Sequence, residues 1–354
     1  MQASETRSRE VVSLWGKLRF ERQRYRCSCC GGSTTVWRDE SLDDSGLSPE
    51  VLKRVHDAGT LLPYRKASQL LEGWGLSLSK SKLACVNQRL NRLLQKQAAS
   101  QLKARLKQAL KPGEQRLSWV IEIDGKFVPT RVKAGLEWRE VKTAVLYKLH
   151  RPSQRYYVSY LGHHSDFAEQ VHGLLRHAGL TQLDQLIGIS DGAQWIANLM
   201  GELGVHRHIL DVYHASTYLD TLMLGLGWSP EARELERRSL LRGELDLQTW
   251  LNHFVTPEAE LKDEAAKALA YLEKQALLDH TCYPRFKAEG IEVIASGQIE
   301  GANKSVIGNR LNLSGALWSE PGACAMAYAR AQFHSYDPLI PIETIRHQAF
   351  LKAA

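Results

Sequence analysis

Three acidic residues have the types and surroundings needed to share metal ions. Asp124 ends the apolar run of "VIEIDGKF", and Asp191 ends that of "LIGISDGAQW". An acid at the end of an apolar strand and before a glycine is predicted to lie at the carboxyl edge of a sheet, where the glycine lets a ligand approach the backbone. On neighbouring strands the two carboxylates would reach one cation, and Mg²⁺ prefers such hard oxygen ligands.

The third acid is Glu300 in "ASGQIEGANKSVIGNR". Two divalent ions about 3.5 to 4 Å apart serve phosphodiester chemistry, and holding them takes a further carboxylate. Gly297 and Gly301 leave room around Glu300 for metal and DNA backbone. Lys304 lies one turn further on the same helical face, where it would hold a phosphate, and Arg310 follows as a second cation. We therefore predict a two-metal site for Mg²⁺ or Mn²⁺ at Asp124, Asp191 and Glu300, with Lys304 and Arg310 on the DNA.

Each of these features has an ordinary alternative. An Asp-Gly pair after a strand is usually just a turn. Glu300 and Lys304 alone would form a surface pair worth under about 0.5 kcal/mol. The order of the three acids, each in its expected element, favours the site.

The elements that position the acids begin after Pro112-Gly113, which marks a domain boundary. Hydrophobic periodicity predicts three strands, a helix, a strand, a helix and a strand, with the first strand over 116–125. This is the order of an RNase H-like α/β sheet. We expect residues 113–227 to form the first part of the catalytic domain, 228–290 a charged helical insertion, and 291–354 the final part with C-terminal helices.

Residues 1–45 are predicted to form a basic β-hairpin and cysteine module that turns near Gly16. Cys27 and Cys30 have the C-x-x-C spacing that presents two thiolates to Zn²⁺. A closed site needs four ligands, and no second such pair lies nearby. Free cysteines in a degenerate zinc ribbon are the alternative, and we expect substoichiometric zinc or none.

Residues 46–112 are predicted to be helical, beginning at Ser48-Pro49 with a capping residue and a proline in the first turn. A helix, a glycine-led turn and a second helix resemble a helix-turn-helix. Lys80 and Lys82 open the second helix, where they would contact phosphates of DNA. The alternative is an ordinary helical hairpin.

Composition sets the frame for these elements. The chain has 354 residues, 44% of them hydrophobic, and a net charge of +7 that permits a polyanionic partner without requiring one. It has no apolar run of about 18 residues and no hydrophobic leader, so we expect neither a membrane span nor secretion. Six cysteines in a chain of this size suit a reducing cytoplasm.

The motifs "IEIDG", "GISDGAQW" and "SGQIEGANKSVIGNRLNLSGALWSEPGA", in that order, resemble bacterial insertion-sequence transposases of the DDE type, closest to the ISKra group. The resemblance extends to "GKLRFERQRYRCSCCG" and "LLPYRKASQLLEGWGLSLSKS". It implies an RNase H-like domain that cuts and joins double-stranded DNA with Mg²⁺ or Mn²⁺, and a dimer or larger assembly on DNA in the bacterial cytoplasm, at the nucleoid. It also implies that Asp124, Asp191 and Glu300 form the catalytic triad.

Two further features belong to the resemblance. Asp211 and His214 in "LDVYH" match the D-x-x-H signature of DDE enzymes with a helical insertion, where they support the site. A helix-capping aspartate with a core histidine is the alternative. The family usually has a C-x-x-C pair upstream of the hairpin, and this chain lacks it, which puts zinc binding in doubt.

Two other functions stay open at this stage. One is an RNase H-like nuclease that cuts DNA without joining strands. The other is a DNA-binding regulator, a domesticated or inactive copy that uses only residues 1–110. The presence of all three acids argues against the regulator.

Overall fold

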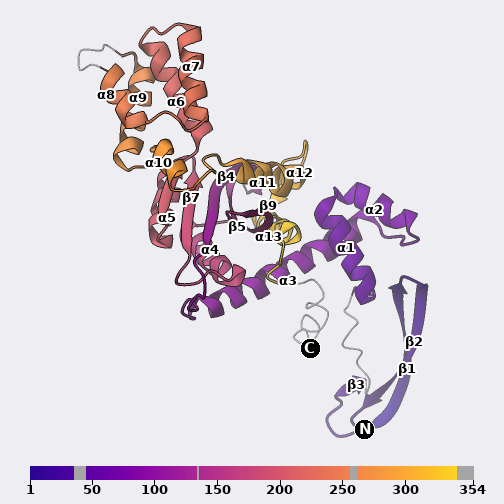
Figure 1. Cartoon of the computed structure of the whole chain (residues 1–354). Coiled ribbons are helices and arrows are strands. Elements are labelled where there is room, and N and C mark those ends of the chain that lie inside the picture. The colour runs from indigo at the N-terminus through magenta and orange to yellow at the C-terminus, as the bar shows by residue number, and fades with distance from the viewer. Residues whose placement is uncertain (36–44, 134, 256–260, 341–354) are drawn as a thin grey trace.

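The computed structural model describes residues 1–35, 45–133, 135–255 and 261–340. Two predicted segments lie partly outside these residues: the first module at 36–44, and the final part of the catalytic domain at 341–354. The described chain forms a small antiparallel sheet, a helical region and a larger α/β region with a helical extension (Figure 1). None of its described helices is both long enough and apolar enough to cross a membrane.

The N-terminal sheet has three antiparallel strands, β1 (Gln2–Ser13), β2 (Gly16–Arg26) and β3 (Ser33–Thr35). The predicted hairpin is confirmed, with Ser13 paired to Gly16 across the turn. Gly16 has a φ of +103°, a conformation that favours glycine. The Ser13 hydroxyl donates to the Gly16 carbonyl at 2.9 Å and closes the turn.

Three helices follow: α1 (Pro49–Leu61), α2 (Tyr64–Gly73) and α3 (Lys80–Leu106). Ser48 caps α1 and Ser79 caps α3, each through a side chain that accepts a backbone N–H three residues on. These helices confirm the predicted helix, turn and helix. α3 continues for 27 residues and packs against α4 and α13 of the α/β region, so it joins the two regions.

The larger sheet has six strands, with the order β6-β5-β4-β7-β8 and the short β9 paired to β4. β4, β5 and β6 are antiparallel neighbours, whereas β7 and β8 run parallel to β4. The predicted order of strands and helices is confirmed. The bounds are β4 (Ser118–Val132), β5 (Gly135–Lys148), β6 (Arg151–Leu161), α4 (His164–Ala178), β7 (Gln185–Ser190), α5 (Gln194–Leu203), β8 (Arg207–Leu210), α6 (Val212–Gly225) and β9 (Trp318–Ser319).

The first strand differs from its predicted end. β4 does not stop at Gly125 but continues to Val132, because β5 pairs with it over its whole length, from Trp119–Lys148 to Val132–Gly135. The pairing with β7 ends earlier, at Glu122–Ile189. Asp124 therefore lies inside a strand, just beyond the point where β4 and β7 separate.

Alternate residues of β4 pack into different hydrophobic clusters, as the two-residue period of a strand requires. Val120 and Val128 belong to one cluster, and Trp119, Ile121 and Ile123 belong to the other. Glu122 and Asp124 share the face of Val120. The cluster on this face also takes side chains from α6, from the helical insertion and from the segment around Glu300.

The predicted helical insertion is present in the described residues. It consists of α7 (Pro230–Leu241), α8 (Leu247–Phe254), α9 (Asp263–Leu277) and α10 (Tyr283–Ala288). α6 packs against both α7 and α9, and these helices extend from one end of the sheet (Figure 1).

The segment that carries Glu300 is a broken helix. α11 (Gly297–Ala302) passes into a π-helix, η1 (Asn303–Gly308), and ends as α12 (Asn309–Leu311). After β9 the chain forms α13 (Glu320–His334), most of whose side chains are buried. π-helical turns within α-helices are frequent at functional sites, where the extra residue re-aims side chains.

Candidate active site

Strand register brings the predicted aspartates together. Each β4–β7 pair, from Ser118–Gln185 to Glu122–Ile189, joins residues 67 positions apart, and the same offset matches Asp124 with Asp191. β7 and β8 pair with an offset of 20, from Ile187–Arg207 to Ser190–Leu210, which likewise matches Asp191 with Asp211. Three aspartates therefore stand at equivalent positions where three neighbouring parallel strands stop pairing.

The electrostatics agree with this placement. Burial raises the pKa of Asp124 to about 6, and the negative charge of Asp191 adds to the rise. Hydrogen bonds oppose it: Gly125 N donates to Asp124 Oδ1 at 2.7 Å, and Asn303 Nδ2 donates to Oδ2 at 2.5 Å. Asp191 is held by its own loop, where Oδ1 accepts from Ala193 N at 2.9 Å. Two acids at equivalent positions of neighbouring strands, with interacting charges, favour a cation between them.

Glu300 reaches this edge through the backbone around it. Glu122 Oε2 accepts from Ile299 N at 2.8 Å, and Asp124 Oδ2 accepts from Asn303. Asp211 Oδ2 accepts from the backbone N and the hydroxyl of Ser296, both at 2.6 Å. Three acids of the sheet edge thus fix the start and the end of the short helix that carries Glu300.

The Glu300 side chain is exposed, as is that of Lys304. A Cβ at Gly297 or Gly301 would meet no atom within 4 Å, so the space predicted beside Glu300 is open. Among the described residues, Glu300 and Lys304 form no ion pair with each other. In the described chain, the carboxylate oxygens of Asp124, Asp191 and Glu300 do not all lie within 4.8 Å of one another.

The predicted supporting residues, Asp211 and His214, lie at the start of α6. Asp211 caps α6, with Oδ1 accepting from His214 N at 2.7 Å, and it is 4% exposed. The His214 ring lies 5.4 Å from that of Tyr218 and 6.3 Å from that of Tyr271. The capping alternative for Asp211 is therefore observed. Its bonds to Ser296 also connect the cap to the segment of Glu300.

Arg310 is a correction to the predicted DNA contacts. Its guanidinium is buried between the rings of Tyr64 and Trp318, at 4.4 and 4.9 Å, and only 4% of the residue is exposed. Its Nε and Nη2 both donate to the Gly59 carbonyl of α1 at 3.2 Å. A side chain in this position cannot meet DNA. Lys80, Lys82 and Lys304, in contrast, are exposed.

Protein side chains lie beside the glycines after the two aspartates. A Cβ at Gly125 would collide with the end of the Glu140 side chain on β5. Gly192 has a φ of +81° and faces the hydroxyl of Tyr271, which donates to the Asp191 carbonyl at 2.6 Å. This glycine allows α9 of the insertion to touch the Asp191 loop.

The cysteine module brings together more thiols than its spacing indicated. The sulfurs of Cys27, Cys29 and Cys30 lie within 4.8 Å of one another, and those of Cys27 and Cys29 are 2.9 Å apart. Hydrogen bonding from Cys29, followed by backbone N–H donors, lowers the pKa of the Cys27 thiol to about 6. This cluster is one ligand short of a closed zinc site within the described chain, so the expectation of little or no zinc stays a prediction.

Sequence reasoning missed two residues of this edge, Glu122 and Asn303. Glu122 is fully buried, accepts from the Tyr147 hydroxyl at 2.6 Å, and has a pKa raised by burial to about 7. The alternation of "VIEID" could have placed it on the same face as Asp124. No pattern marks Asn303, whose Oδ1 is buried without a hydrogen-bond partner.

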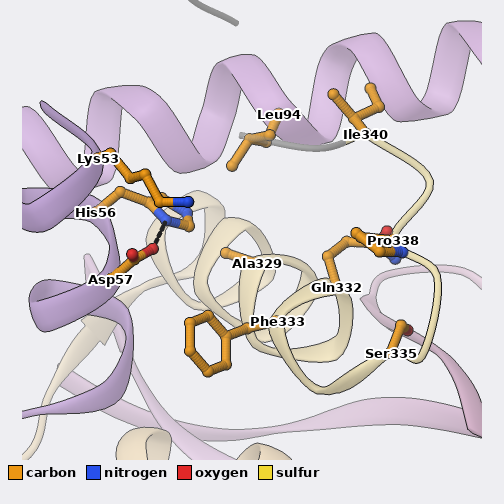
Figure 2. Close-up of a pocket in the computed structure, with 10 residues that line it drawn as sticks. All are labelled: Lys53, His56, Asp57, Leu94, Ala329, Gln332, Phe333, Ser335, Pro338 and Ile340. Carbon is orange, nitrogen blue, oxygen red and sulfur yellow. Dashed lines mark hydrogen bonds and ion pairs between the residues drawn. The ribbon is translucent and has the colours of Figure 1, made fainter. Parts of the chain in front are cut away.

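A separate cavity of about 230 Å³ lies where α13 meets α1 and α3 (Figure 2). Its lining includes Lys53, His56, Asp57 and Phe333. His56 Nδ1 lies 3.1 Å from Asp57 Oδ1 (Figure 2). None of the carboxylates of the sheet edge lines this cavity.

The fold and the edge define an α/β protein whose six-stranded mixed sheet carries aspartates in register. Neither comparison with protein-family models nor comparison with curated proteins gives a match. Among solved structures, the chain is similar to one titled "Crystal structure of the Mos1 Strand Transfer Complex", at 12% sequence identity over 66% of this chain and 78% of that one. The TM-score is 0.18, which carries no weight for fold or function.

Proposed function

We propose that this chain is a DNA transposase of the DDE type, resembling the ISKra group of insertion sequences. Its catalytic acids would be Asp124, Asp191 and Glu300. One observation carries the proposal: Asp124 and Asp191 are in register at the edge of parallel strands, beside a helix that carries Glu300 and is bonded to the same edge. The strand order β6-β5-β4-β7-β8 is consistent with an RNase H-like domain.

The side chains at this edge fit divalent metal. The donors are carboxylate oxygens, with the unpartnered Oδ1 of Asn303 beside them, and these are the hard ligands that Mg²⁺ and Mn²⁺ prefer. Burial raises the pKa of Asp124 and the negative charge of Asp191 adds to the rise, so a bound cation would favour the ionised carboxylate. When bound, two such ions would activate the attacking oxygen and stabilise the leaving oxygen of a phosphodiester.

The remaining residues would hold the DNA. Lys304 is exposed next to Glu300 and would contact a phosphate there, while Lys80 and Lys82 at the start of α3 would contact the transposon ends. The same edge would serve both hydrolysis at each end and attack of the resulting 3′-OH on target DNA, since both steps are displacements at phosphorus. Because two ends must meet, the active form would be a homodimer or a larger assembly on DNA.

The test uses the purified full chain and duplexes that carry the DNA flanking this reading frame, with Mg²⁺ or Mn²⁺. We expect cleavage that leaves a 3′-OH and joining of that end to a second duplex, both lost in Asp124→Asn and Asp191→Asn. Cleavage without joining would assign the chain to the nucleases instead. Binding without any metal-dependent cleavage would favour a regulator and refute the proposal.

A further inference from the structure

The loop that carries Asp191 is short and lies between two regular elements. β7 ends at Ser190 and α5 begins at Gln194, so Asp191, Gly192 and Ala193 belong to neither. The loop holds the Asp191 side chain itself, through Ala193 N, which donates to Oδ1 at 2.9 Å. Its backbone, in contrast, is held from outside the sheet, by helix α9 of the insertion.

Two side chains of α9 reach this loop and the helix that follows it. The Tyr271 hydroxyl donates to the Asp191 carbonyl at 2.6 Å. Lys274 Nζ donates at 2.8 Å to Oε1 of Gln194, the first residue of α5. Gly192 allows Tyr271 to come so close, because a Cβ at this position would collide with the tyrosine hydroxyl. The insertion therefore bonds to both ends of the Asp191 loop.

Tyr271 is itself held by an aromatic partner. Its ring stacks on that of Tyr218 of α6, with the ring centroids 4.1 Å apart and the planes inclined by 21°. Both residues are half-buried, and α6 packs against α9. α6 is capped by Asp211, which follows β8 as Asp191 follows β7. Tyr271 is therefore fixed against a helix that begins at the same sheet edge.

We propose that Tyr271 is a positioning residue for the metal site: its hydroxyl fixes the backbone at Asp191 and so sets how tightly this carboxylate holds a divalent cation. The inference rests on the metal-dependent function proposed above and gives the helical insertion a part in it. Mg²⁺ demands near-octahedral geometry, so its ligands must be held in place. Partners behind metal ligands commonly contribute about 10- to 100-fold to metal affinity or activity. Tyr271 acts through the Asp191 carbonyl and not by contact with the metal.

The experiment measures Mn²⁺ binding by the purified full chain, from the loss of the electron paramagnetic resonance signal of free Mn²⁺. Asp124→Asn identifies the ions held at the sheet edge, as those that it fails to bind. Tyr271→Phe keeps the stacked ring but removes the hydroxyl, and we expect it to bind these ions about 10-fold more weakly. Tyr218→Phe is the matched control: it removes the other hydroxyl of the stack and leaves the bond to Asp191 intact, so it should bind Mn²⁺ as the wild type does.

Two further measurements separate positioning from a general loss of structure. Hydrogen exchange in peptides that cover residues 188–195 should rise in Tyr271→Phe and not in Tyr218→Phe, because one hydrogen bond to this loop is lost. Thermal unfolding without metal should shift by at most about 4 °C in either variant, since each change removes a single hydroxyl.

Equal Mn²⁺ affinity in Tyr271→Phe and the wild type would overturn the inference. So would an equal loss of affinity in the two tyrosine variants, which would assign the effect to the stack as a whole. Wild-type Mn²⁺ binding that Asp124→Asn does not reduce would also overturn it, because the ions would then lie elsewhere.

A nicking assay on supercoiled plasmid with Mn²⁺ separates this inference from the proposed function. If the wild-type chain nicks the plasmid while Tyr271→Phe binds Mn²⁺ as tightly as the wild type, the positioning inference fails and the enzymatic proposal stands. If Tyr271→Phe binds Mn²⁺ more weakly as expected but the wild type does not nick, the enzymatic proposal fails and the positioning of the metal site stands.

Discussion

Some carboxylates at the sheet edge are buried, and others are at least partly exposed to solvent. Glu122 and Asp211 are buried, and each accepts a backbone N–H from the segment around Glu300. Asp124 is half-buried and Glu300 is exposed. The buried pair therefore positions the helix, whereas the open acids remain available to a ligand.

The first prediction concerns Glu300. Glu300→Gln keeps the shape of the side chain but loses the anion, so metal-dependent cleavage and strand joining should both fall by about 10²-fold or more if several kcal/mol of charge stabilisation is lost. Folding should be unchanged because the side chain is exposed and bonds to nothing described. Glu292→Gln, a change to another exposed glutamate just upstream, is the matched control. Near-normal joining by Glu300→Gln would remove this residue from the site.

The second prediction uses the pKa of Asp124, raised to about 6 by burial and by Asp191. A raised pKa in the folded state means that this group favours folding below its unfolded pKa of about 4, and that the benefit is lost as the pH rises through about 6. Without metal, the wild-type chain should therefore lose more thermal stability than Asp124→Asn between about pH 4.5 and 7.5.

Mg²⁺ added near pH 7.5 should restore stability to the wild-type chain and not to Asp124→Asn, since ligands that bind the folded state stabilise it. Thermal unfolding at both pH values, with and without the ion, makes the measurement. Equal pH dependence in the two proteins would show that Asp124 holds no unusual proton. An equal response to Mg²⁺ would remove it from the metal site.

At the scale of elements, the helix-turn-helix resemblance depends on where α3 begins. Ser79 caps this helix and leaves Lys80 and Lys82 exposed in its first turn. If this turn lies on DNA, Lys80→Gln/Lys82→Gln should flatten the salt dependence of duplex binding by up to about 2. Lys103→Gln, near the other end of α3, is the control because it lies beside Glu169 on α4. A slope unchanged by the double substitution would mean that α3 is an ordinary packed helix.

Much of the element order follows from local periodicity, which places the strands and the helical insertion, and Ser48-Pro49 marks the start of α1. The end of β4 does not follow from periodicity. The local pattern at Gly125 predicts a turn, but pairing with β5 continues the strand to Val132. Asp124 and Asp191 lie at equivalent positions of neighbouring strands because of the β4–β7 register, which forms only between segments distant in the sequence. The sequence predicts that Asp124 and Asp191 each lie near a strand end. It does not predict that Glu122 bonds to Ile299 or that Asn303 bonds to Asp124.

The structure of the helix after Glu300 could not be predicted from local sequence either. A regular helix predicts which residues share a face with Glu300, but η1 adds a π-helical turn from Asn303 to Gly308 before Arg310. Charge alone marked Arg310 as a DNA contact. Its actual partners, Tyr64 and Gly59, come from helices more than two hundred residues earlier.

At the scale of the whole molecule, two buried arginines connect the helical region to the segment of the candidate site. Arg310 donates to the Gly59 carbonyl of α1. Arg330 of α13 donates to the Thr60 carbonyl at 2.8 Å, and also to the Val306 and Ser305 carbonyls of η1. Burial lowers the pKa of both arginines, that of Arg330 to about 10. Arg330 thus joins the last turn of α1 to the π-helix beyond Glu300, and Arg310 joins the same turn to α12.

The last prediction tests this connection through Arg310→Met. The change keeps apolar bulk between the rings of Tyr64 and Trp318 but leaves the Gly59 carbonyl without its two donors, at a cost of about 1 to 3 kcal/mol. Hydrogen exchange should rise in the last turn of α1 and in α12 together, because the Arg310 side chain joins these two elements. Arg242→Met in the insertion, whose arginine is exposed and pairs with Glu244, should change neither region. If Arg310 instead met DNA, its loss would flatten the salt dependence of binding and leave exchange and thermal stability unchanged.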